Sequence, residues 1–289
     1  MKRRSFLRGS ALLTLSSIVS PGFAGKAGAQ SVGFVDAVEA TRKTVLGHFS
    51  QHSYRVVEAT ALATGRAQLN GGLRHWPPET LQQPGHMVIQ PIAKLDDIGE
   101  RHRPDVLPVF HVFISYRKSG DTPADAFDHQ LAFLLDRMKL DRERVVLISS
   151  EFLEPFRPVV ERHKINWNRQ VFMRKSGEAK AAGDGSGFIR IETPGGPYEA
   201  ATVGVHYWLG KRPIPRIAAY PPASEWTEVG ETILDDKVPN GFVIGIERLL
   251  LALTGAYPTW DEYMGQLVKY VETSKDPHAL KTLQKYRRP

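Results

Sequence analysis

The sequence contains no cysteine among its 289 residues. Disulfides, thiolate-ligated metal sites and a cysteine nucleophile are therefore excluded. Several patterns with a known chemical mechanism are also missing, namely a phosphate-binding loop, a dinucleotide-binding glycine fingerprint, a zinc-protease helix and a serine nucleophile elbow. Their absence removes the usual sequence support for P-loop, Rossmann, zinc-hydrolase and α/β-hydrolase chemistry.

Long apolar runs are also scarce, and the one near the N-terminus follows basic residues. Arg3-Arg4 precedes Ser5-Phe6-Leu7, an apolar run spans 11–19, and a small-residue site ends at Ala29. This order predicts a signal peptide over residues 1–29, and the paired arginines favour the twin-arginine export machinery. We expect a periplasmic or secreted protein with no stable membrane insertion after cleavage. The alternative is a cytosolic protein with a basic N-terminus.

The mature chain lacks a strong net charge. The formal charge of +7 falls to +2 once the five basic residues of the predicted signal peptide are removed. This balance does not favour a nucleic-acid-binding surface. Residues 30–289 are sufficient for one sizeable domain, and no internal repeat or linker divides them.

Hydrophobic patterning predicts many strands and few helices. Helices are expected over 33–50, 124–138, 247–254 and 261–270. Strands are expected over 54–58, 86–90 (ended by Pro91), 109–116, 145–148, 188–191, 201–208, 227–234 and 241–246. Residues 176–186 are expected to form a mobile loop, and 213–222 a proline-rich crossing. Because successive strands have few helices between them, we predict an α+β fold with a mostly antiparallel sheet flanked by helices.

The most informative motif is a glycine-rich strand, Asn240-Gly241-Phe242-Val243-Ile244-Gly245, that leads into an apolar helix beginning with Ile246-Glu247-Arg248. The glycines allow the strand to lie close to a ligand. Arg248 and the helix dipole can face the same anion. The segment resembles the third signature motif of class II aminoacyl-tRNA synthetases, in which the strand forms the floor of the ATP site and the arginine meets the γ-phosphate.

Three earlier segments resemble the same family, closest to its alanyl type, and they occur in the expected order. Residues 49–58 resemble the first motif, residues 90–98 the run before the second motif, and residues 195–199 the Gly-Pro…Glu turn beside the adenine and amino-acid pockets. The likeness covers nearly the whole mature chain. It implies that residues 30–289 form a class II synthetase-like catalytic core, exported as a stand-alone paralog.

The resemblance also implies roles for individual residues. The catalytic candidates are Arg248 for the γ-phosphate and Arg101 or Arg103 for the α-phosphate, because fixed guanidinium groups stabilise phosphate charge. The nucleotide-binding candidates are Glu199, Gly245, Glu247 and His111. The substrate-binding candidates are Asp97, His206 and Asp236. ATP and Mg²⁺ are the implied cofactors, with Mg²⁺ bridging phosphates, and no metal centre of the protein itself is expected.

Several positions depart from the family pattern. His111 replaces the acid of the second motif, and Asp105 lies nearer than an arginine to the place of the second-motif arginine. Gly241 occupies the position where the alanyl type has the aspartate that anchors the substrate ammonium, while Asp235 and Asp236 lie a few residues earlier. The chain has no room for the tRNA-recognition, editing and C-terminal domains, so no tRNA partner is expected. A homodimer formed through the first-motif helix is implied.

Each candidate also has a structural alternative. Arg248 could be an ion-pair partner, Asp96-Asp97 a turn, His111 a packed hydrogen-bonded residue, and His206-Tyr207-Trp208 part of a core. The leading prediction is an ATP-dependent, adenylate-forming ligase-like protein that acts on an amino acid or related carboxylate. The alternative is a catalytically inactive periplasmic protein that binds an amino acid or nucleotide-like ligand. A structural or assembly partner is the third reading.

Overall fold

The computed structural model describes residues 33–59, 69–70, 83–93, 107, 109–193 and 196–255, with positions 265, 268, 269 and 272 beyond them. All of these residues belong to one compact unit, Gly33–Pro289. No helix in these ranges is both long and apolar enough to cross a bilayer.

The strands in the described ranges are β1 Arg55–Val56, β2 Leu69–Asn70, β3 His86–Ala93, β4 Val109–Tyr116, β5 Val145–Ser150, β6 Val171–Arg174, β7 Asp184–Gly185, β8 Phe188–Thr193, β9 Gly196–Trp208, β10 Trp226–Ile233 and β11 Asn240–Gly245. The α-helices are α1 Phe34–Gln51, α2 Pro123–Leu131, α3 Arg157–Arg162, α4 Trp167–Gln170, α5 Ser176–Ala182 and α6 Ile246–Thr254. A π-helix, η2 Ala132–Arg137, continues α2, and two 3₁₀ segments, η3 Arg142–Arg144 and η4 Glu151–Phe156, flank β5.

The strands join in one sheet in the order β1-β3-β4-β11-β10-β9-β5-β6, with β2 beside β3 and the β7–β8 hairpin paired to β9. Within the described strands, the β1–β3 and β5–β6 pairs are parallel and all other pairs are antiparallel. The predicted α+β class with a mostly antiparallel sheet is confirmed.

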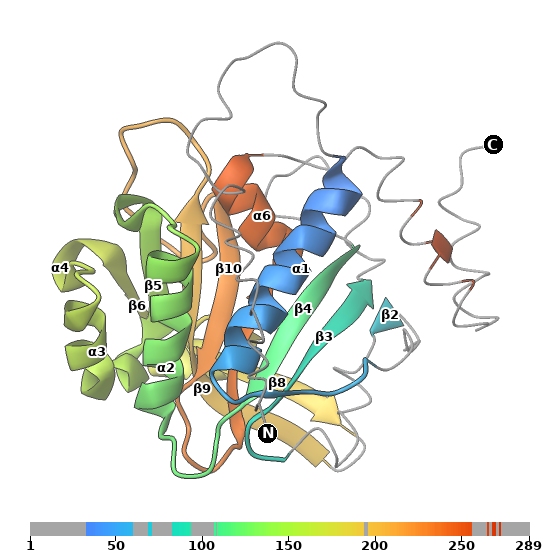
Figure 1. Ribbon diagram of the computed structural model, residues 1–289. Coiled ribbons are helices and arrows are strands. Elements are labelled where there is room, and N and C mark those ends of the chain that lie inside the picture. Colours follow the sequence, from blue (N-terminus) through green and yellow to red (C-terminus); the bar gives the residue numbers. More distant parts are fainter. Residues whose placement is uncertain are drawn as a thin grey trace, which may run out of the picture. The chain divides into compact units, whose positions relative to one another are not determined.

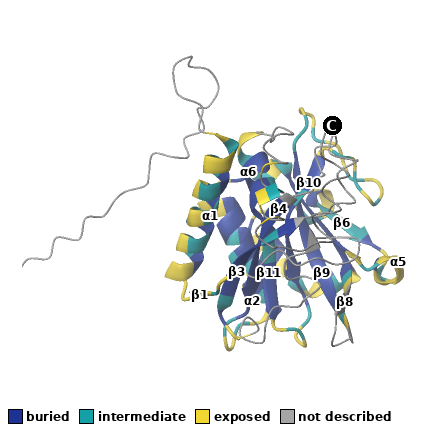
Figure 2. Cartoon of the chain, turned by 90° about the vertical axis from the view of Figure 1, so that its right-hand side faces the viewer, coloured by how far each residue is buried: buried dark blue, intermediate teal, exposed yellow. Residues whose placement is uncertain are grey.

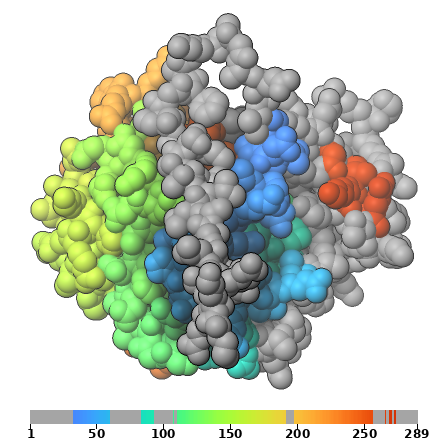
Figure 3. Space-filling view, viewed as in Figure 1, coloured from blue at the N-terminus to red at the C-terminus, as the bar shows by residue number. Residues whose placement is uncertain are grey.

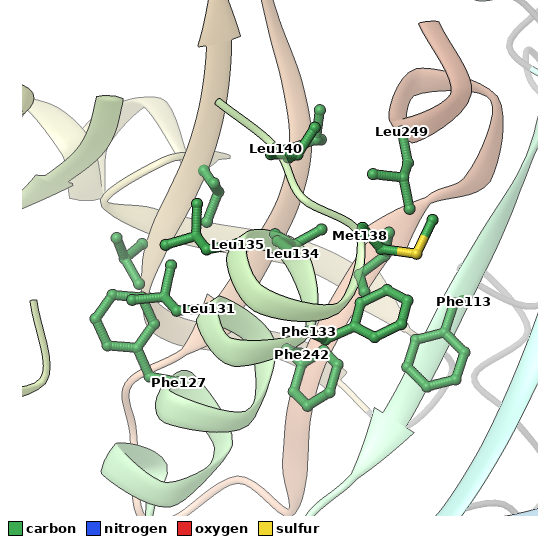
Figure 4. Close-up of a cluster of buried hydrophobic side chains, with 14 of the residues drawn as sticks. Phe113, Phe127, Leu131, Phe133, Leu134, Leu135, Met138, Leu140, Phe242 and Leu249 are labelled. Carbon is green, nitrogen blue, oxygen red and sulfur yellow. The ribbon is translucent and has the colours of Figure 1, made fainter. Parts of the chain in front are cut away.

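Helices α1, α2 with η2, and α6 cover one face of the sheet (Figure 1). Every second residue of a strand points to the same side of a sheet. Phe113 of β4 and Phe242 of β11 point to the side of these helices and pack near Phe133 (Figure 4). The rings of Phe49 and Phe113 stack with centroids 4.8 Å apart. Burying one such ring stabilises the fold by roughly 2–3 kcal/mol. We call this side the helix face and the other side the opposite face.

Helix α1, in blue, and the segment from α2 through η2, in green, both lie on the surface that faces the viewer in the space-filling view (Figure 3). The exposed residues of helix α1 lie on its outer side, and the strands next to it are largely buried (Figure 2). Thr122 accepts a hydrogen bond from the Asp125 amide and, with Pro123 in the first turn, begins α2. Gly255, at φ +69°, ends α6.

Two local predictions are wrong. Strand β3 continues past Pro91 to Ala93, and a proline is tolerated there because β3 pairs on its outer side only near its two ends, with β1 and β2. Residues 176–182 form helix α5 instead of a mobile loop. Alanine, glutamate and lysine are strong helix formers, and Gly183 at φ +61° ends the helix. The helix predicted over 261–270 lies almost entirely outside the described residues.

Candidate functional site

The segments that resemble the synthetase motifs are neighbours in the structure. Helix α1 packs on α6, β1 pairs with β3, β3 with β4, and β4 with β11, which runs directly into α6. The part of the 195–199 turn that is described, from Gly196, begins β9. Strands β3 and β4 thus lie beside the strand–helix junction at Gly245, and α1 packs on the helix that follows it, whereas residues 196–199 lie near Asn240, at the other end of β11.

Glu247 and Arg248 are consecutive residues of α6 but have different environments. Glu247 is 1% exposed, and its two carboxylate oxygens accept hydrogen bonds from the amide and the ring Nδ1 of His111, at 2.7 and 2.6 Å. His111 shares the helix face with Phe113 because the two alternate along β4. The pair ties β4 to the start of α6, and the packed, hydrogen-bonded alternative therefore describes His111.

Arg248 extends over the opposite face. Its guanidinium lies 5.0 Å from the ring centroid of Phe110, and Nη1 donates to the carbonyl of Glu228 at 3.3 Å and lies 3.6 Å from Glu228 Oε2. Its buried Nε has no hydrogen-bond partner among the described residues. A Cβ added to Gly245 would lie 3.2–3.5 Å from the Arg248 side chain, so the glycine provides the space in which this arginine lies.

Glu228 links Arg248 to a second polar group, formed by Ser186 and His206. Ser186 Oγ donates to Glu228 Oε1 at 3.1 Å and lies 2.9 Å from His206 Nε2. A Cβ at Gly204 would overlap with Ser186 Oγ and lie 2.8 Å from Glu228 Oε1. We call Ser186, His206, Glu228 and Arg248 the polar cluster. It exists only because β9 carries no side chain at position 204.

Burial shifts the protonation of two groups here. It lowers the pKa of His206 to about 4, an effect that Glu228 opposes and Arg248 reinforces. The pKa of Glu231 is raised to about 7, mainly by burial and to a smaller extent by repulsion from Glu228. Glu231 Oε1 accepts a hydrogen bond from the Ser186 amide at 2.9 Å. At neutral pH the His206 imidazole of the cluster is therefore neutral, and the Glu231 carboxyl group, which accepts from the backbone of Ser186, is partly protonated.

The β7–β8 turn that carries Ser186 is fixed by Arg174. Its Nη1 donates to Asp184 at 2.6 Å and to the carbonyls of Gly185 and Ser186, and its guanidinium lies 3.6 Å from the ring centroid of Tyr220. Because four separate contacts hold one buried guanidinium, the turn and its serine have a defined position over β9.

The other predicted site residues lie elsewhere. Asp236 is 83% exposed in the β10–β11 loop, where it pairs with Arg117. Glu199 is exposed and pairs with Arg190 of β8. Glu199 lies seven residues before His206 in β9, a separation of roughly 23 Å along a strand. Asp97, Arg101 and Arg103 fall outside the described residues. The structure therefore brings together Arg248, Gly245 and His206 from the predicted set.

Three members of the site were missed by the sequence reasoning: Ser186, Glu228 and Glu231. Two signals could have found them. The run Asp184-Gly185-Ser186-Gly187 places a serine between two glycines at a turn, and Glu228 and Glu231 are acids inside a strand whose neighbours are mostly buried. Acids in such a strand need partners, and their partners define the cluster.

Mg²⁺ typically binds proteins through one or two carboxylates together with substrate phosphates. No group of three or more His, Asp or Glu side chains in the described ranges could hold a metal ion. Glu228, with its side chain 31% exposed beside Arg248, is a carboxylate of the required kind. Glu228 is therefore the residue that would contact a metal ion brought in with a phosphate ligand.

The fold and the site together define an α+β protein with a polar cluster on one face of a mostly antiparallel sheet. Neither a comparison with protein-family models nor one with curated protein sequences gave a match. Function is therefore inferred from the residues and geometry of this chain.

Proposed function

We propose that the opposite face of the sheet binds a nucleotide and a carboxylate, and that the protein is an ATP-dependent, adenylate-forming ligase-like protein without tRNA-recognition domains. The substrate class is an amino acid or a related carboxylate. The observation that carries the proposal is the position of Arg248 in the space left by Gly245, with a buried Nε–H that has no partner among the described residues and with the Glu228 carboxylate beside it.

Arg248 supplies the cation that a polyphosphate needs. Its contact with Glu228 Oε2, at 3.6 Å, is longer than a charge-assisted hydrogen bond, so a phosphate oxygen can replace this partner at small cost. Glu228 is then available for Mg²⁺ on the same phosphates. When bound, MgATP would supply the activated phosphate, and pyrophosphate would be the product released. The pairing of β3 with β4 and of β4 with β11, which brings the described parts of the second and third motif-like segments together, supports the same function.

The test is ATP–pyrophosphate exchange by the purified protein with a panel of amino acids and other carboxylates. We expect exchange that depends on one carboxylate class and falls at least tenfold in Arg248→Ala. Arg157→Ala is the matched control, because Arg157 is an exposed arginine of α3 paired with Glu161. Exchange that is equal in wild type and Arg248→Ala would contradict the proposal.

A second candidate function, ligand binding without catalysis, is favoured by Gly241. Glycine stands where the alanyl type has its substrate-anchoring aspartate, and a Cβ added there would lie 2.9 Å from Ser115 Oγ, so an aspartate would fit only if Ser115 moved. The periplasm is also not expected to supply ATP. Under this candidate, MgATP or an amino acid binds the polar cluster and no carboxylate in the panel supports exchange.

Export by the twin-arginine route remains part of the proposal, because residues 1–32 lie outside the described ranges. Substituting Arg3 and Arg4 by lysine should retain the protein, uncleaved, in the cytoplasmic fraction. Processing and export that continue unchanged in this variant would contradict the route.

A further inference from the structure

Ser186 has a backbone conformation that serine rarely adopts. Its φ is +47°, and the flanking Gly185 and Gly187 are at +90° and +132°. A non-glycine residue in such a region costs about 1 kcal/mol or more, and strained residues of this kind cluster at functional sites. The hydroxyl also lies over Gly204, where any Cβ would overlap with it. Two unusual local features therefore position one side chain oxygen.

The neighbours of Ser186 determine where its proton lies. The hydroxyl donates to Glu228 Oε1 at 3.1 Å, and His206 Nε2 lies 2.9 Å from Oγ. A hydroxyl has one proton, so His206 must donate from Nε2 when that proton points to Glu228. The oxygen is thus flanked by a carboxylate that can accept its proton and by an N–H that stabilises the negative charge left behind.

His206 also has an unused acceptor. Its side chain is 7% exposed, and its buried Nδ1 has no partner among the described residues. With the proton on Nε2, Nδ1 is a bare acceptor, which costs roughly 1–3 kcal/mol unless a ligand or water donates to it. A fixed structural network would be expected to satisfy this atom, and the cluster does not.

From this geometry we propose that Ser186 is a nucleophile that accepts the acyl group of an activated carboxyl compound, either an ester or a mixed acyl–phosphate anhydride. Oγ forms a bond to the carbonyl carbon, the bond from that carbon to the leaving-group oxygen breaks, and the Oγ proton passes to Glu228, which returns it to the leaving group. Water then hydrolyses the serine ester, which releases the carboxylic acid and restores the hydroxyl.

Arg248 sets the preferred leaving group. Glu228 reaches Ser186 through Oε1 and Arg248 through Oε2, so the guanidinium lies on the far side of the same carboxylate. An anionic leaving group such as a phosphate is therefore favoured over a neutral alcohol. Ser186 is 2% exposed and the Glu228 side chain 31%, so the substrate approaches along Glu228. This activity does not require ATP and goes beyond the proposed ligase function.

The experiment uses a fluorophosphonate probe, in which Oγ attacks phosphorus and fluoride leaves, followed by intact-mass measurement and peptide mapping of the purified protein. We expect one adduct, on Ser186, and none in Ser186→Gly. Glycine suits φ +47°, so this variant removes the hydroxyl without adding backbone strain. Ser149→Ala is the control, because Ser149 is a buried serine that donates only to the Thr202 carbonyl, and it should keep the adduct.

Glu228→Gln separates a nucleophile from an accidental adduct. A glutamine cannot take the proton, so labelling should slow at least tenfold, while circular dichroism and the unfolding midpoint stay close to wild type. Hydrolysis of an acyl phosphate such as acetyl phosphate should fall in parallel. The proposal is overturned if the folded wild-type protein gives no adduct at millimolar probe, or if Ser186→Gly labels as fast as wild type.

Discussion

The Glu247–His111 pair on the helix face and the polar cluster on the opposite face differ in how their buried polar atoms are partnered. On the helix face, Glu247 and His111 pair with each other inside an apolar core. On the opposite face, Arg248 Nε and His206 Nδ1 are buried without a partner among the described residues. A buried polar group that lacks a partner costs free energy, and proteins commonly retain it where a ligand completes the contact. Buried atoms that lack a described partner also occur on the helix-face side, such as His129 Nδ1 in α2, so we assign the ligand site to the opposite face because two such atoms lie there in one cluster with Glu228.

The junction between β11 and α6 serves both faces. Glu247 and Arg248 are adjacent in sequence, yet one fixes the interior and the other belongs to the polar cluster. A substitution at one of these residues should therefore change the stability of the core, and a substitution at the other should change the polar cluster. Single substitutions on each face separate the two effects.

Breaking the Glu247–His111 pair should have the largest effect on stability. Glu247→Ala leaves the amide and ring of His111 without their shared partner, and we expect the free energy of unfolding to fall by roughly 3–5 kcal/mol. Arg248→Ala removes a largely buried arginine whose contacts with Glu228 are 3.3 and 3.6 Å long, and it should cost less, about 1–2 kcal/mol. Urea denaturation of both variants measures the difference. Equal losses would contradict the division between the faces.

The next largest effect concerns pH and Glu231. Its pKa is raised from 4.5 to about 7 by burial, so the folded state binds the proton more tightly than the unfolded chain. This contribution to stability is complete below pH 4.5 and is lost as the pH rises through 7. Relative to wild type, Glu231→Gln should therefore become more stable by up to about 3 kcal/mol between pH 4.5 and pH 8.

The contribution of His206 to stability should change with pH in the opposite direction to that of Glu231, so His206 serves as an internal control. Its pKa is lowered from 6.5 to about 4, so the unfolded chain binds the proton more tightly and wild-type stability falls as the pH drops from 6.5 to 4. His206→Asn should remove that acid-side loss without changing the slope above pH 7. Unfolding midpoints at half-unit pH steps test both residues, and parallel curves for wild type and Glu231→Gln would refute the raised pKa.

A smaller effect is expected from filling the space at position 204. Gly204→Ala places a methyl group against Ser186 Oγ and Glu228 Oε1, which should lower stability by about 1–3 kcal/mol and displace the serine. Gly177→Ala in α5 is the matched control, because nothing lies within 4 Å of its added Cβ. This control should be neutral or stabilising by up to about 1 kcal/mol. Thermal unfolding compares the two.

The smallest effect should come from Asp236, a residue that the sequence assigned to substrate binding. It is 83% exposed, and Arg117 also donates to the carbonyls of Asp235, Asp236 and Val238. We expect Asp236→Asn to change stability by less than about 0.5 kcal/mol and to leave ligand affinity unchanged. A tenfold loss of affinity in this variant would move the substrate site to the β10–β11 loop.

Much of the fold could be predicted because its central elements carry strong local patterns. The alternation in β4 and the helical spacing of α1 are long enough to identify each element. The short elements between β5 and β7 could not be found in this way. Helices α3 and α4 have six and four residues, and β6 has four, so their positions depend on packing against β5.

The site was predictable only in part, for a different reason. Arg248 and Gly245 belong to one continuous motif, and a sequence shows such a motif directly. The contacts of Ser186 with His206 and Glu228 join residues 20 and 42 positions apart, and they depend on the register of β9 with β10 and on the missing Cβ of Gly204. Neither condition is visible before the sheet is assembled.

Calorimetric titration with MgATP tests directly whether the opposite face of the sheet binds a nucleotide. The purified wild-type protein is compared with Arg248→Ala and Arg157→Ala. If the opposite face binds the nucleotide, wild type and Arg157→Ala should bind with equal affinity, and Arg248→Ala should bind at least tenfold more weakly. Equal binding by all three proteins would contradict the account and place the nucleotide elsewhere, for example in the cavity of about 330 Å³ beside His48 and His129 on the helix face.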